Sequence, residues 1–226
     1  MEARAGITDL VLGAVLAGCA ARLWQVPWAH RYWPLTFLAA ATGSLVGAVH
    51  HLLFAGSRRA SDLSWLAVGV LVAVAISYLL AASATELLDR RRARLVIRLR
   101  IAGLIAYLTA TAVAGIGRAT PLVLCESVTM AAIVGLWLYG WQAGHPGAGT
   151  MVAGIAAGAA SAAVFLLPAG LLVRTVGLDA SSVQHLGQIP GLLLIVHVVA
   201  GGTLTGPSGP APQLFPTLWF VRTDRG

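Results

Sequence analysis

Long hydrophobic runs alternate with short polar segments along the whole chain. A bilayer core about 30 Å thick needs roughly 20 apolar residues per helix, and seven runs approach that length. They cover residues 7–24, 34–54, 63–86, 99–117, 121–141, 150–173 and 183–200. The pattern therefore predicts an all-α, polytopic membrane protein, with a seven-transmembrane-helix bundle over residues 1–200 and no soluble domain.

Local signals refine this prediction. Thr120 and Pro121 are typical of an N-cap and a first-turn proline at the start of the fifth span. The sixth span consists mostly of small residues, which let helices approach closely, so we expect it inside the bundle. The Pro/Gly-rich tail, 201–226, cannot be helical throughout and is expected to dock at the cytoplasmic interface. Six tryptophans fall near predicted interfaces, as in an aromatic belt: Trp24, Trp28, Trp33, Trp65, Trp141 and Trp219.

Composition excludes several classes of protein. Hydrophobic residues make up 58% of the chain and charged residues only 10%, whereas soluble domains carry about 25% charged residues. Such a chain cannot cover a water-facing surface, which excludes an ordinary soluble enzyme, a disordered protein and a nucleic-acid-binding domain. The chain also contains no lysine, so it cannot form a retinal Schiff base.

The arginines predict an orientation. With an outside N-terminus and a cytoplasmic C-terminus, ten arginines fall inside and five outside. Six of the ten flank the loop between the third and fourth spans: Arg90, Arg91, Arg92, Arg94, Arg98 and Arg100. This asymmetry suits a bacterial cytoplasmic (inner) membrane.

Ionisable residues inside spans are costly and therefore mark candidate sites. In this orientation most of them fall toward the outer half of the membrane: Asp9, His50, His51, Asp62, Glu126 and His185. Imidazole and carboxylate groups suit zinc, and a catalytic zinc needs three protein ligands and an open position for water. We expect His50, His51 and His185 as metal ligands, with Glu126 or Asp62 as a ligand or general base.

Each candidate also has a purely structural interpretation. Asp9 follows Thr8, and this pair is typical of a cap on the first helix, which we favour. Asp62 follows Ser61 and is a cap candidate in the same way. Glu126 could instead pair with Arg118 across a short loop. His50 and His51 follow Gly43 and Gly47 at helical spacing, which places both histidines near a close-packed stripe.

Three segments together resemble uncharacterised bacterial seven-helix proteins related to the progestin/adiponectin receptor and alkaline ceramidase (CREST-like) superfamily. The segments are ITDL at 7–10, GSLVGAVHH at 43–51 and VQHLGQIPG at 183–191. The resemblance is spread over about 200 residues, and no single motif is specific. It implies a zinc ion held by one histidine of the second span and two of the seventh, which activates water to hydrolyse a lipid amide or ester.

Carried over, the resemblance assigns roles to His50 or His51, to His185, to Ser44 and to Asp62. The second histidine of the seventh span should lie one helical turn before His185, where Ala180 and Ser181 stand instead. A zinc ion held by two histidines would need Glu126 or Asp62 as its third ligand.

Two functions of different classes follow. The incomplete ligand set and the small-residue packing faces favour an integral membrane protein without a complete catalytic site, an accessory or structural subunit with other membrane subunits as partners. The alternative is a zinc-dependent membrane hydrolase acting on a membrane lipid. A transporter is disfavoured because the chain shows no convincing internal repeat.

Overall fold

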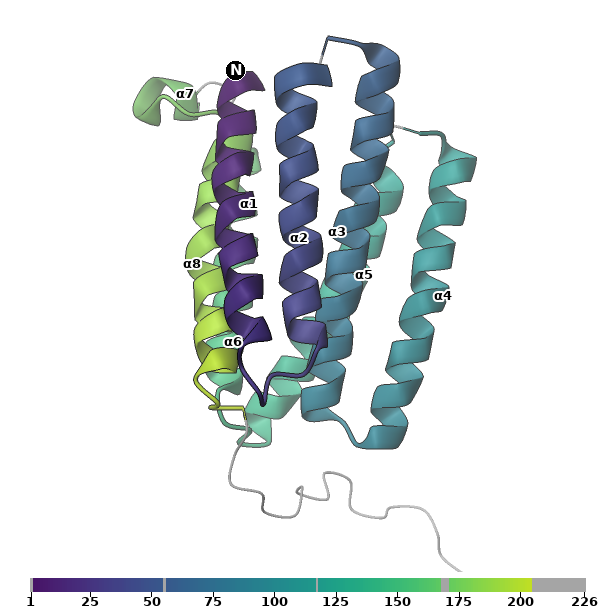
Figure 1. Cartoon of the computed structure of the whole chain (residues 1–226), viewed down its shortest axis with the longest axis vertical. Helices are drawn as coiled ribbons and strands as arrows, with labels where there is room; N and C mark the ends of the chain where they lie inside the picture. Colours follow the sequence, from purple (N-terminus) through teal and green to yellow (C-terminus); the bar gives the residue numbers. More distant parts are fainter. Residues whose placement is uncertain (1, 55, 117, 168–170, 205–226) are drawn as a thin grey trace, which may run out of the picture.

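The computed structural model describes residues 2–54, 56–116, 118–167 and 171–204, which form helices joined by short turns and contain no strand (Figure 1). The helices are α1 (Glu2–Trp24), α2 (Tyr32–Val49), α3 (Arg58–Leu87), α4 (Arg90–Ala114), α5 (Thr120–Gln142), α6 (Ala148–Ser161), α7 (Leu171–Val176) and α8 (Ala180–Ala200). A π-helical segment, η1 (His50–Phe54), extends α2, and a 3₁₀ segment, η2 (Ala162–Leu166), extends α6. Among the described residues, seven helices are long and apolar enough to cross a membrane, which confirms the expected all-α class and the number of candidate spans.

Two helix boundaries differ most from the prediction. The fourth helix begins at Arg90 rather than at residue 99, because the Asp89 carboxylate accepts hydrogen bonds from the backbone N–H groups of Arg91 and Arg92 and caps it. The expected sixth span to residue 173 is wrong: α6 ends at Ser161 and η2 at Leu166. Pro168 has no N–H with which to continue a helix, and α7 is a separate short helix.

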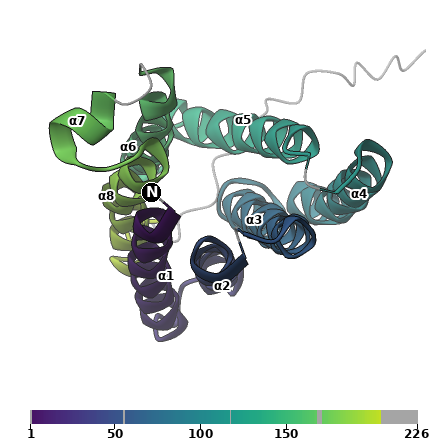
Figure 2. The same ribbon diagram turned by 90° about the horizontal axis from the view of Figure 1, so that it is seen from above.

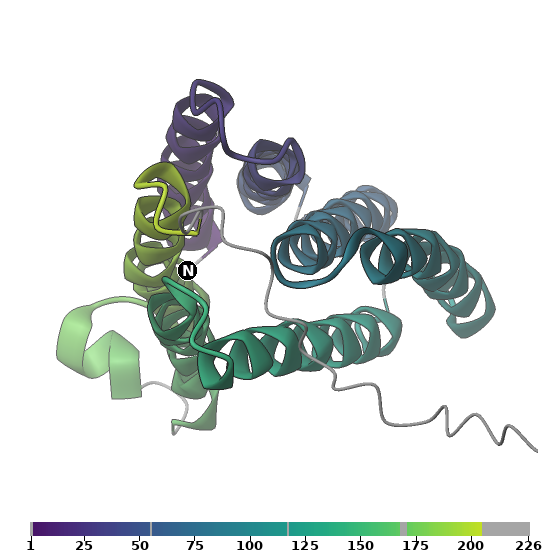
Figure 3. The ribbon, with the colours of Figure 1, turned by 90° about the horizontal axis from the view of Figure 1, so that it is seen from below.

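Neighbouring spans pack mainly in sequence order. The helix α2 lies between α1 and α3, α4 follows α3, and α8 closes back against α1 and α6 (Figures 2 and 3). Trp33, Trp137 and Phe37 are among the fully buried side chains of the core. Trp33 therefore does not face lipid as a belt residue would, because its indole N–H donates to the Glu86 carboxylate inside the bundle. Trp24, Trp28, Trp65 and Trp141 are exposed as expected, and Trp219 lies outside the described residues.

The small-residue face of α6 packs closely against α8. A Cβ atom on Gly154 would lie 2.9 Å from the carbonyl oxygen of Gly191, so the two backbones touch. The expectation that this span lies inside the bundle is wrong, however, since α1 and α3 are more buried than α6. Small residues bring one face of α6 onto α8, and α6 also packs against α5, while much of its remaining surface is exposed.

Candidate functional site

Four helices bring polar side chains together at the end of the bundle where α1 begins. At this end α2 passes into η1, and both α3 and α8 begin (Figure 1). The N-terminal halves of α1 and α8 therefore lie at the same end of the bundle as the end of α2. This agrees with the similar depths predicted for the titratable residues of these helices.

The centre of this group is Asp9, whose side chain is buried between two histidines. One carboxylate oxygen, Oδ1, lies 3.3 Å from Nδ1 of His185. The other, Oδ2, lies 3.9 Å from Nε2 of His51. We call Asp9, His51 and His185 the Asp9 cluster, which joins α1, η1 and α8.

The contacts of His185 favour one tautomer of its ring. The hydroxyl oxygen of Thr8 lies 3.4 Å from Nδ1 of His185, while the Thr8 hydroxyl donates to backbone carbonyls of α1. With Asp9 ionised, both neighbours of Nδ1 are acceptors, which favours the tautomer with the proton on Nδ1. In that tautomer the lone pair of His185 resides on Nε2, the nitrogen that could bind a ligand.

Gly47 makes room for the Asp9 carboxylate between α1 and α2. A Cβ atom at position 47 would lie 2.9 Å from Oδ2 of Asp9, which is closer than such atoms can approach. Gly43 and Gly47 are both buried, and so is His50, which confirms that this stripe of α2 faces inward. The interpretation of Thr8 and Asp9 as a cap is wrong, because α1 already begins at Glu2.

His50 points to α3 instead of joining the Asp9 cluster. Its Nδ1 lies 2.7 Å from the hydroxyl oxygen of Ser64, and its ring packs 4.7 Å from the Trp65 ring. The rings of His50 and His51 meet edge to face with 5.0 Å between centroids. A line of polar groups therefore runs from Ser64 through the two histidines to Asp9 and His185.

The remaining candidates lie elsewhere. Asp62 is inside α3, which begins at Arg58, so its interpretation as a cap is wrong. Ser44 faces α1, where a Cβ on Gly13 would lie 3.4 Å from its Cβ. Glu126 is exposed on α5, a helix that packs against α3, α4 and α6 and lies along the opposite edge of the bundle from α1 (Figure 2). Within the described part of the chain, Glu126 and Arg118 form no salt bridge.

These positions test the fit of a zinc ion. In the described ranges, no group of three or more His, Cys, Asp or Glu side chains is placed to bind one metal ion. A catalytic zinc with three protein ligands therefore does not fit the present arrangement. The metal-ligand roles of His50, His51 and His185, and the catalytic roles of Glu126, Asp62 and Ser44, stay predictions.

Sequence reasoning named Asp9 as a candidate but favoured a helix cap for it, and it assigned no site role to Thr8 or Ser64. Asp9 carried a usable signal, because an acidic residue within an apolar run at the depth of two histidines is a natural partner for them. No comparable signal marked Ser64 or Trp65, because serine and tryptophan are common near span ends.

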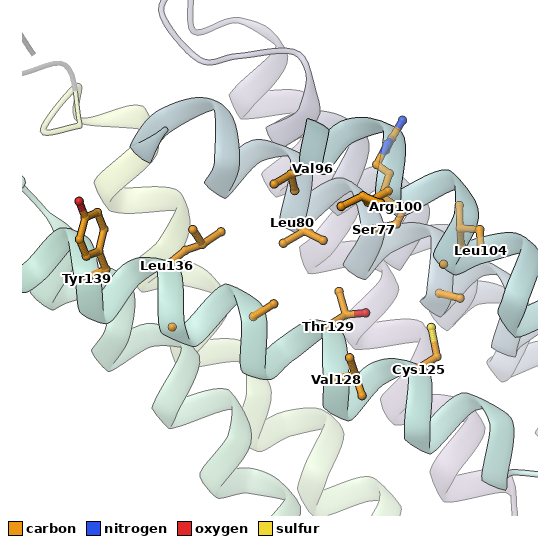
Figure 4. A pocket seen from close by; sticks show the side chains of 15 residues that line it. Ser77, Leu80, Val96, Arg100, Leu104, Cys125, Val128, Thr129, Leu136 and Tyr139 are labelled. Atoms are coloured by element: carbon orange, nitrogen blue, oxygen red, sulfur yellow. The ribbon is translucent and has the colours of Figure 1, made fainter. Parts of the chain in front are cut away.

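A separate cavity of about 520 Å³ lies between α3, α4 and α5. Its volume is within the range of small-molecule sites, but its lining is apolar and contains no histidine or carboxylate. Figure 4 shows Leu80, Val96 and Leu136 directed toward it, with Thr129 and Cys125 on its α5 side. The Asp9 cluster and this cavity are distinct places in the fold.

Residues 5–203 match the model of a family of unknown function, DUF6962. The chain belongs to this family. The matched range contains all three residues of the Asp9 cluster. Neither a curated protein nor a solved structure matches the chain, so the resemblance to the receptor and ceramidase superfamily stays a prediction.

Proposed function

We propose that this protein is an integral membrane protein without a complete catalytic site, working as an accessory or structural subunit of a membrane complex. The observation that carries the proposal is the Asp9 cluster, in which side chains from α1, η1 and α8 lie within 4 Å of one buried carboxylate. Buried polar groups that are paired in this way hold helices in register. The cluster thus ties α1, α2 with η1, and α8 into one unit.

The surface of the bundle supports partners within the membrane. The helices α4 and α5 bury only a few residues each and expose large apolar side chains that include Leu95, Ile105, Val123 and Val128. In a membrane, such faces contact lipid tails or the helices of other subunits.

We further propose that the N-terminus lies outside and the C-terminus lies in the cytoplasm, in a bacterial inner membrane. The support is the crowding of six arginines in the first half of α4, toward the same end of the bundle as Arg22 and Arg31. Positive residues are retained on the cytoplasmic side during insertion.

Metal analysis of the protein purified in mild detergent tests the main proposal. We expect no stoichiometric metal, and the same companion subunits in repeated preparations at a fixed ratio to the chain. The His185→Ala variant should leave the metal content unchanged, and His145→Ala, at the opposite end of the bundle, is the matched control.

The second candidate is a zinc-dependent hydrolase of a lipid amide or ester. The observation that favours it is the contact of His185 Nδ1 with Asp9, because carboxylates often orient metal-binding histidines in this way. One zinc per chain, lost in His185→Ala and kept in His145→Ala, would establish this candidate and overturn the first.

A further inference from the structure

Arg100 is a partly buried charged residue on a spanning helix. It lies ten residues after Arg90, the first residue of α4, and therefore about 15 Å along that helix, where it is level with Tyr32 at the start of α2. A charge that is partly buried among helices is costly unless it has a partner. In Figure 4 the Arg100 side chain leaves the rim of the apolar cavity and points away from α5.

The guanidinium group of Arg100 packs on two tyrosines. Its central carbon lies 4.6 Å from the ring centroid of Tyr78 on α3 and 5.3 Å from that of Tyr32 at the start of α2. The guanidinium of Arg31 lies 5.5 Å from the same Tyr32 ring. We call Arg31, Tyr32, Tyr78 and Arg100 the arginine–tyrosine cluster.

This cluster has positive charge but no counter-charge in the described part of the chain. The salt bridges found there involve Asp9 and Asp89 and include neither Arg31 nor Arg100. The Nε atom of Arg100 is buried and has no hydrogen-bond partner, an arrangement that costs stability unless a ligand accepts its proton. Burial, and then the positive charge of Arg31, lower the pKa of His30 beside the cluster.

We propose that the arginine–tyrosine cluster binds the phosphate of an anionic phospholipid. Guanidinium groups bind phosphate through paired, charge-assisted hydrogen bonds, and two of them share one aromatic ring here. Basic sites between membrane helices are typical places for anionic headgroups.

The position of the cluster favours a lipid over a soluble anion. The helices α2, α3 and α4 follow one another along one edge of the bundle (Figure 3), and the Arg31 side chain of the cluster is exposed. Exposed arginines in the first turns of α4 make this end of the bundle positive and attract anionic headgroups. The long Arg100 side chain carries its charge toward Tyr32 and Arg31, at the end of the span.

Native mass spectrometry of the purified full-length chain tests this proposal, with dioleoyl phosphatidylglycerol and dioleoyl phosphatidylcholine as probes. We expect one tightly bound phosphatidylglycerol per chain and weaker binding of phosphatidylcholine. Arg31→Gln and Arg100→Gln should each weaken phosphatidylglycerol binding about fivefold. Arg100→Lys, which keeps the charge, should bind more tightly than Arg100→Gln.

The matched control is Arg98→Gln, which removes the same charge from the same helix. Arg98 is exposed and lies two residues before Arg100, on a nearly opposite face of α4, so binding should change less than twofold. Equal losses in Arg98→Gln and Arg100→Gln, no preference for phosphatidylglycerol, or its displacement by millimolar inorganic phosphate would each overturn the proposal. Arg31 is exposed and precedes α2, so Arg31→Gln decides the question even if Arg100→Gln does not fold.

Discussion

The chemistry of the Asp9 cluster depends on the size of a neighbouring residue as much as on its charged members. Asp9 fits beside α2 because position 47 has no side chain. Polar groups inside an apolar bundle are stable only when such space lets them reach one another. The glycine therefore belongs to the site although it takes no part in its hydrogen bonds.

Gly47→Ala should lower the stability of the protein. The added Cβ would lie 2.9 Å from Oδ2 of Asp9, so the carboxylate or the helix must shift, at a cost of about 1–3 kcal/mol. Thermal unfolding in detergent measures this as a lower Tm. Gly18→Ala is the matched control, because a Cβ at position 18 meets nothing within 4 Å. Equal Tm values for the two variants would contradict the described fit of α1 against α2.

At the residue scale the sequence predicted part of the site. His51 and His185 share a depth and come together near one carboxylate, but that carboxylate belongs to Asp9 rather than to Asp62 or Glu126. Asp9 resembled a cap because the apolar run begins only at residue 7, whereas α1 begins at Glu2. The extra turns place Asp9 inside the helix, where its carboxylate needs a partner.

At the element scale, capping extends α4 through its arginine-rich segment. Hydrophobicity alone could not predict this start, because the first turns of α4 are strongly charged. Arginine nevertheless favours helix formation, and its long side chain reaches water from the end of a span.

The cap makes the stability of α4 depend on pH. Hydrogen bonds from the backbone N–H groups of Arg92 and Arg91, together with the positive charges of these two residues, hold the pKa of Asp89 below its usual range. A group with a depressed folded-state pKa stabilises the fold above its unfolded pKa, about 4, and loses this contribution as the pH falls through the folded value. Asp89→Ala should therefore lower Tm at pH 7, and the difference from the wild type should shrink below about pH 4.

Thermal unfolding of both proteins across this pH range makes the measurement. Asp89→Asn is the control, because asparagine caps helices about as well as aspartate and does not titrate. A difference between wild type and Asp89→Ala that persists undiminished at the lowest pH would show that the carboxylate charge has no part in the cap.

At the scale of the whole molecule, the proposed orientation can be measured directly. With a cytoplasmic C-terminus, a green fluorescent protein fused after Gly226 should fluoresce in a bacterial host, and alkaline phosphatase fused there should be inactive. Replacing Arg90, Arg91 and Arg94 by glutamine should reduce this asymmetry, whereas Arg58→Gln with Arg59→Gln should strengthen it. An active phosphatase fusion to the unaltered chain would reverse the assignment.

The sequence by itself determined that the chain forms seven long apolar helices and roughly how far along its helix each titratable group lies. Inside lipid, every backbone polar group must be satisfied within its own segment, so an apolar run of this length becomes a helix, and the fixed rise per residue sets the depth. Only the tertiary structure decided which side chains meet. Helices that are apolar on all sides carry little pattern to show which face turns inward, and their rotation depends on where a glycine allows a neighbour to approach.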